Sequence, residues 1–78
     1  MREKHLRVIL TFHTTTDAMA MEACCTEKGI SGRLIPVPTV ITAGCGLCWS
    51  APPEEQEAAL FAAKTAGIPV AGVYQMMI

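Results

Sequence analysis

The residue best suited to chemistry in this sequence is a cysteine that stands between two glycines. Cys45 follows Gly44 and precedes Gly46 in the segment Ala43-Gly44-Cys45-Gly46-Leu47-Cys48. Glycine has no Cβ, so it lets the backbone approach a ligand closely and adopt positive φ. A loop thiol becomes a nucleophile when it loses its proton, and nearby amides or cations lower its pKa. We therefore predict that Cys45 is the reactive residue; the alternative is a small apolar side chain beside a tight turn.

Cys48 lies three residues after Cys45, which is the C-x-x-C spacing of redox pairs and metal sites. A structural zinc ion needs four ligands. The further ligands would have to come from the remaining histidines and cysteines, which are His5, His13, Cys24 and Cys25. If Cys48 lies in a strand, its side chain can point away from that of Cys45. We expect no metal and no cofactor, and we keep a metal site at Cys45 and Cys48 as an alternative.

A second polar cluster, His13-Thr14-Thr15-Thr16-Asp17, separates an apolar strand from a helix. His13 could act as an acid, a base or a ligand. The hydroxyls of Thr14, Thr15 and Thr16 could hold an anion at the helix N-terminus, where free amides and the helix dipole favour negative charge. The simpler interpretation is capping, with Thr16 or Asp17 accepting the amides of the first turn.

The elements that must position these residues follow from periodicity and turn chemistry. Strands are predicted over residues 6–12, 32–38, 47–51 and 70–78, and helices over 18–28 and 52–66, with Gly29 ending the first helix. The order βαββαβ predicts one α+β domain over residues 1–78, a ferredoxin-like sandwich with two helices on one face of an antiparallel sheet. Right-handed crossovers give strand order 4-1-3-2. Pro36 and Pro38 agree with it, because proline is confined to edge strands.

This topology brings the loop around Cys45 and the turn that begins at His13 to one end of the sheet. Arg33 lies on the predicted edge strand, either as an anion ligand near these loops or as a solvated charge that discourages aggregation. Cys24 and Cys25 lie on the apolar side of the first helix, where core packing is expected.

Composition excludes several classes of function. The net charge is −1, with six basic and seven acidic residues and no basic stripe, so nucleic acid is not an expected partner. No stretch approaches the roughly 20 apolar residues that cross a bilayer, and no export signal is evident. We expect a soluble cytoplasmic protein with reduced thiols. Because 51% of the residues are hydrophobic, the second sheet face could also join two copies into a homodimer.

Three segments carry a resemblance to a known family. They are Leu10-Thr11-Phe12-His13-Thr14-Thr15-Thr16-Asp17-Ala18-Met19-Ala20-Met21-Glu22, Gly32-Arg33-Leu34-Ile35-Pro36-Val37-Pro38 and Ala43-Gly44-Cys45-Gly46-Leu47. Over about residues 6–77 the chain resembles the putative selenium/sulfur carrier-like family of small bacterial proteins. The resemblance implies a cytoplasmic protein of selenium or sulfur metabolism whose G-C-G cysteine, Cys45 here, is the carrier residue. Cys48 is not part of the shared pattern.

Three functions follow as hypotheses. The first is a carrier, rather than a stand-alone enzyme, in which Cys45 holds sulfur or selenium as a persulfide or selenopersulfide between donor and acceptor proteins. Its thiolate would be stabilised by the first helix and Arg33. The second is a metal-binding module that uses Cys45 and Cys48. The third is a regulatory or interaction domain that binds a partner through the edge strand or the open sheet face.

Overall fold

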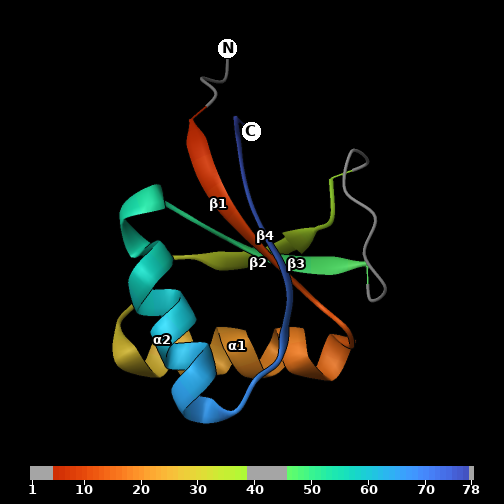
Figure 1. Ribbon diagram of the computed structural model, residues 1–78, viewed down its shortest axis with the longest axis vertical. Coiled ribbons are helices and arrows are strands. Elements are labelled where there is room, and N and C mark those ends of the chain that lie inside the picture. The colour runs from red at the N-terminus through yellow and green to blue at the C-terminus, as the bar shows by residue number, and fades with distance from the viewer. Residues whose placement is uncertain (1–4, 39–45, 78) are drawn as a thin grey trace.

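A computed structural model describes residues 5–38 and 46–77, and its strands and helices follow the predicted order (Figure 1). The four strands form one antiparallel sheet in the order β2-β3-β1-β4, which is the predicted order read from the other edge. The predicted α+β, ferredoxin-like arrangement is confirmed. The elements are β1 (Leu6–Phe12), α1 (Thr15–Lys28), β2 (Arg33–Pro36), β3 (Leu47–Ala51), a 3₁₀ turn (Pro53–Glu55), α2 (Gln56–Ala66) and β4 (Val70–Met77).

Both helices pack against one face of this sheet. Side chains alternate between the two faces along each strand, so the even-numbered residues of β1 and the odd-numbered residues of β3 point toward the helices. Trp49 and Phe12 are the largest buried side chains, and small residues of α2 let that helix approach closely. The buried cluster consists of Val8, Leu10, Phe12, Ala18, Met21, Cys25, Trp49, Ala51, Ala59 and Ala63.

Helix α1 begins earlier than the sequence predicts. Thr14 is the N-cap, and its Oγ1 accepts a hydrogen bond from the Asp17 amide at 3.1 Å. The expectation that Thr16 or Asp17 caps the helix is wrong, because both residues already lie in its first turn. The other end is as predicted: Gly29 has φ 72° and its amide donates to the carbonyls of Cys25 and Thr26. A positive φ of this size favours glycine.

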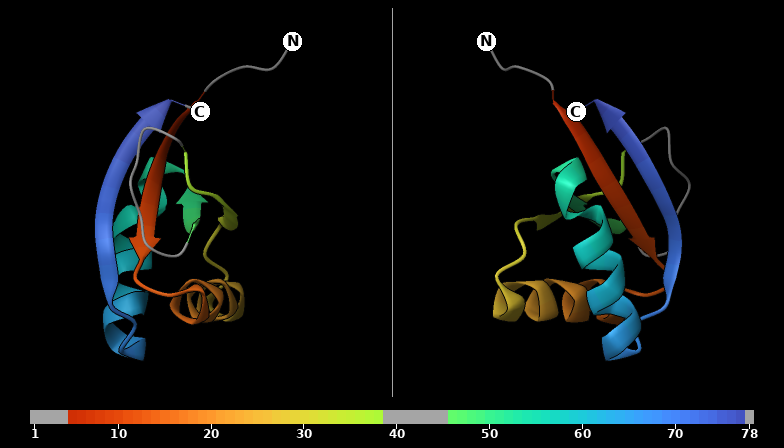
Figure 2. Two further views of the ribbon diagram at one scale, coloured as in Figure 1. Left: turned by 90° about the vertical axis from the view of Figure 1, so that its right-hand side faces the viewer. Right: turned by 60° about the vertical axis from the view of Figure 1, so that its left-hand side comes forward.

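The two edge strands differ in length and composition. β2 has four residues and contains Pro36, which confirms its predicted place at an edge, although it is shorter than the predicted segment 32–38. β4 forms the other edge, has eight residues and pairs with β1 from Leu6↔Met77 to Phe12↔Val70. Figure 2 shows β4 (blue) alongside β1 (red to orange) in both views.

Candidate functional site

The loop predicted to carry the reactive thiol is described only at its two ends. Cys45 and Gly44 lie outside the described residues. At the base of the loop, the amide of Val37 donates to the carbonyl of Gly46 at 3.1 Å. Gly46 has φ 78°, in the left-handed region that glycine adopts without strain. This hydrogen bond, accepted by the residue that follows Cys45, joins the two described ends of the connection between β2 and β3.

The turn between β1 and α1 leaves the sheet at the same end. Thr11 of β1 lies opposite Cys48 of β3 in the antiparallel register. The chain that leaves β1 toward α1 therefore does so at the end of the sheet where β3 begins (Figure 1). His13 is exposed, as are the three threonines that follow it, Thr14, Thr15 and Thr16. The N-terminus of α1, with its free amides and positive dipole end, thus lies at the end of the sheet that the sequence predicts.

Arg33 is not placed at this end. It is the first residue of β2 and pairs with Ser50, whereas the loop begins beyond Pro36. Arg33 lies three residue steps before Pro36, roughly 10 Å along the strand. Its side chain is exposed at the sheet edge. This position favours the alternative in which Arg33 is a solvated charge on an edge strand.

A different arginine, which the sequence reasoning missed, makes specific contacts with β3. The Arg7 side chain donates from Nε to Ser50 Oγ at 3.1 Å and from Nη2 to the Ser50 carbonyl at 3.4 Å. The sequence signal for this contact was the alternation of side chains along β1. It places Arg7 on the same face as Ile9 and on the opposite face from the core residue Val8. These bonds join β1 to β3 at the end of β3 away from Gly46.

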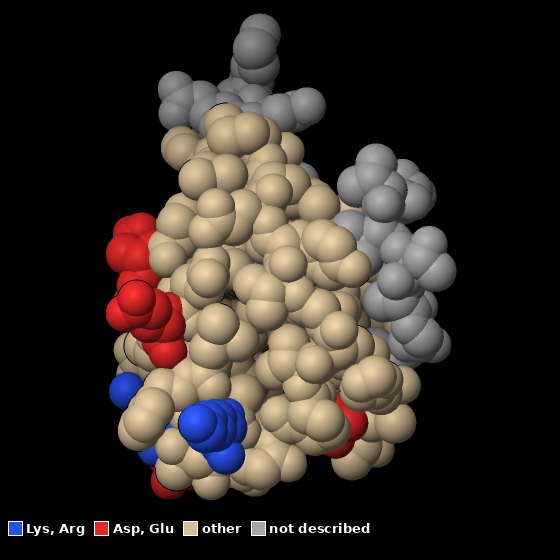
Figure 3. Space-filling view, viewed as in Figure 1, with Lys and Arg blue, Asp and Glu red and all other residues tan. Residues whose placement is uncertain are grey.

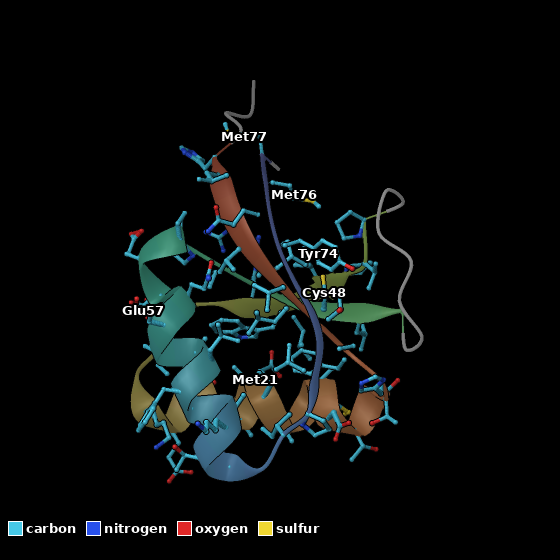
Figure 4. The ribbon with its side chains drawn as sticks, viewed as in Figure 1. Met21, Cys48, Glu57, Tyr74, Met76 and Met77 are labelled. Atoms are coloured by element: carbon cyan, nitrogen blue, oxygen red, sulfur yellow. The ribbon has the colours of Figure 1, made fainter. Side chains whose placement is uncertain are left out.

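Cys48 is buried on the sheet face that carries no helix, which we call the open face. The neighbouring Trp49 points toward the helices, so alternation sends Cys48 the other way. Its Sγ donates to the Pro36 carbonyl at 3.9 Å, and its exposed fraction is 0%. Figure 4 shows Cys48, Tyr74 and Met76 on the side of the sheet away from α1. The residues packed around Cys48 are Ile9, Ile35, Val37 and Met76.

Both cysteines of α1 pack against neighbouring elements, and they differ in how deeply they are buried. Cys25 is 1% exposed in the core between the helices and the sheet, which confirms its predicted role. Burial raises the pKa of the Cys25 thiol to about 11, and electrostatic interaction with the neighbouring Cys24 and Glu55 adds to this shift. Cys24 is half-buried, and its Sγ donates to the Ala62 carbonyl of α2 at 3.9 Å. Cys25 is therefore a protonated, inaccessible thiol at neutral pH.

The raised pKa of Cys25 makes stability depend on alkaline pH. The thiol holds its proton more tightly in the folded chain, so its stabilising contribution is complete below pH 9 and falls as the pH rises toward about 11. We expect the free energy of unfolding to drop over this range, by at most about 1.4 kcal/mol per pH unit from this group. Urea unfolding at several pH values measures the slope. Cys25→Ala should have a shallower slope, and equal slopes would contradict the assignment.

Within residues 5–38 and 46–77, no group of three or more His, Cys, Asp or Glu side chains is arranged to hold a metal ion. The metal-binding alternative uses Cys45, which lies outside the described residues. Among the described helices, none is both long enough and apolar enough to span a bilayer.

Comparison with known proteins gives one match. A family model described as putative Se/S carrier protein-like matches residues 7–75. The matched range begins in β1 and ends in β4, so it includes both helices and the segment that carries Cys45. Searches of the curated proteins and of the solved structures return no match.

Proposed function

The chain belongs to the putative Se/S carrier protein-like family, and from this premise we propose that it carries sulfur or selenium on the thiol of Cys45. The observation that carries the assignment to this residue is the packing of the other three cysteines. Cys25 and Cys48 are buried and Cys24 is half-buried against α2. Cys45 is the remaining thiol, and it stands between two glycines in the sequence.

The proposed transfer needs one nucleophile and one leaving group. The Cys45 thiolate attacks the terminal sulfur of a donor persulfide, R–S–SH. A new S–S bond forms at Cys45, the donor S–S bond breaks, and the donor leaves as the thiolate R–S⁻. The terminal sulfur keeps its oxidation state, so no further oxidant or reductant is needed. A selenopersulfide donor, R–S–SeH, would transfer selenium in the same way, and an acceptor thiolate would repeat the exchange to release Cys45.

The surroundings of the loop support a thiolate at this end of the sheet. The N-terminus of α1 lies there, capped by Thr14, and its dipole favours negative charge within the first turn. His13 is exposed in the same turn and could accept the thiol proton. The hydroxyls of Thr15 and Thr16 are exposed beside it. These groups, rather than Arg33, are the proposed stabilisers of the thiolate and of the persulfide anion.

Intact-mass spectrometry tests the proposal directly. The reduced chain is incubated with glutathione persulfide, separated from it, and weighed with and without a thiol reductant. We expect a gain of one sulfur atom that the reductant removes, with peptide mapping placing it on Cys45. A chain that gains no sulfur, or gains it on Cys24, would overturn the assignment. The proposed setting is the cytoplasm, with proteins that supply and receive the atom as partners.

A further inference from the structure

Among the described residues, no strand pairs with the outer edge of β4. An edge strand presents a row of unpaired amide and carbonyl groups, and natural proteins protect such edges with charges, prolines or bulges. β4 runs over eight residues, Val70-Ala71-Gly72-Val73-Tyr74-Gln75-Met76-Met77, with no charge and no proline. Its one irregularity lies at the start, where the register with β1 shifts between Thr11 and Phe12. From Gly72 to Met77 the edge is regular.

The opposite edge is protected. β2 has only four residues, and it contains Pro36, which has no amide hydrogen to donate. Arg33 at its start is exposed, and a charge on an edge strand opposes further pairing. The sheet therefore has one edge that can accept a strand and one that discourages it.

Exposed apolar side chains gather at the open edge. Val73 is 42% exposed and Met77 is 55% exposed, and Tyr74 and Leu6, which pairs with Met77, are also exposed. Figure 3 shows the face of the molecule on which β4 lies nearest the viewer, and no Lys, Arg, Asp or Glu covers its centre. The charged side chains visible there lie over the helices. This edge therefore suits a neutral, apolar strand.

We propose that two copies of this chain pair antiparallel through their β4 strands and form one continuous eight-stranded sheet. β4 itself is a neutral strand of matching length, so a two-fold axis places no charged residue of one β4 opposite another. The pairing also ends at two copies, because both outer edges of the dimer are then the protected β2 strands. A partner strand from another protein would not by itself limit the assembly to two chains with β2 at both outer edges.

The pairing has a defined geometry. A two-fold axis perpendicular to the sheet keeps all four helices on one face of the continuous sheet. Facing residues must then point to the same side, so the axis passes midway between the two copies of one residue, which faces itself across the axis. Val73 and Tyr74 lie at the middle of β4, and placing the axis between the two copies of either residue pairs the strands over most of their length. The open face is not needed for association, because Ile9 and Cys48 are already buried there within one chain.

Sedimentation equilibrium of the full chain, from micromolar to millimolar concentration, tests the proposal. We expect a reversible dimer, and we expect Val73→Lys to raise its dissociation constant at least about tenfold, because two like charges then lie near each other across the axis. Met19→Lys is the matched control: it places the same charge at an exposed apolar residue of α1 and should leave the dissociation constant unchanged. A wild-type chain that stays monomeric at millimolar concentration would overturn the proposal, and so would equal effects of the two variants.

Hydrogen exchange separates edge pairing from other modes of association. In the dimer, the β4 amides that do not bond to β1 become protected, and dilution or Val73→Lys removes that protection. A dimer in which β4 protection does not change with concentration would contradict the inference. If Val73→Lys does not fold, Gln75→Lys on the same strand replaces it. Neither outcome depends on sulfur loading at Cys45, so this proposal and the carrier function can fail separately.

Discussion

Replacing Cys45 with serine is expected to abolish loading of the chain by a persulfide donor. A serine hydroxyl is not ionised at neutral pH, whereas a cysteine is partly thiolate even at its ordinary pKa. Cys25 and Cys48 offer no substitute, because both are buried and burial raises the pKa of Cys25 to about 11. Intact mass after incubation with glutathione persulfide should show no sulfur retained on this variant.

Cys24→Ser is the matched control for this experiment. Cys24 is the least buried of the described cysteines, and its Sγ donates to the Ala62 carbonyl, a bond that a hydroxyl can also make. Loading of this variant should equal that of the wild type. Cys48→Ala adds a test of the C-x-x-C alternative, because loading should persist without the second thiol. Retained loading in Cys45→Ser, or lost loading in Cys24→Ser, would contradict the lone-thiol mechanism.

Gly32→Ala is expected to destabilise the fold by about 3 kcal/mol or more, at the upper end of what overpacking of a core causes. A Cβ on Gly32 would clash with Cζ2 and Cε2 of the Trp49 ring, and Gly32 also has φ 158°, a backbone conformation that L side chains rarely adopt. Trp49 is fully buried between the sheet and the helices, so its ring has little room to move. Urea unfolding measures the loss. A domain of this size has only about 4–12 kcal/mol of stability in total.

Gly29→Ala separates this clash from backbone effects. Gly29 has φ 72°, and a Cβ there would meet nothing within 4 Å. Its substitution should cost only about 1–2 kcal/mol, the penalty for an L-residue in the left-handed region. Combining Gly32→Ala with Trp49→Phe removes part of the clashing ring, so the double variant should be less destabilised than the sum of the two single changes. Additive losses would show that the ring is not the cause.

Much of the fold was predictable because its signals are local. Alternating apolar residues predicted β1, and Gly29 predicted the end of α1. Pro36 predicted the edge position of β2, since a missing amide hydrogen is a property of the residue itself. The N-cap was not predictable in the same way. Thr14, Thr15 and Thr16 are chemically equivalent caps, and the length of β1 decides which of them is used.

The location of the site at one end of the sheet was predictable, but the set of residues that lie there was less so. The crossover topology correctly placed the turn after β1 and the base of the loop after β2 at one end of the sheet. The position of Arg33 along β2 depends on the register with β3, which distant pairing sets. The contact between Gly32 and Trp49 also joins residues far apart in the sequence. No local sequence pattern predicts the position of Arg33 or the contact between Gly32 and Trp49. The role of Cys45 stays a prediction.

Trp49 is the only tryptophan in the chain, and its burial provides a spectroscopic reporter. Its indole Nε1 is buried with no hydrogen-bond partner among the described residues. An indole in such buried, apolar surroundings fluoresces at shorter wavelength than one in water, and unfolding moves its emission to the red. Because Trp49 contacts Gly32 and packs with residues of both helices, the same signal follows the sheet and the helices together. The native chain therefore reports on its own unfolding without a label.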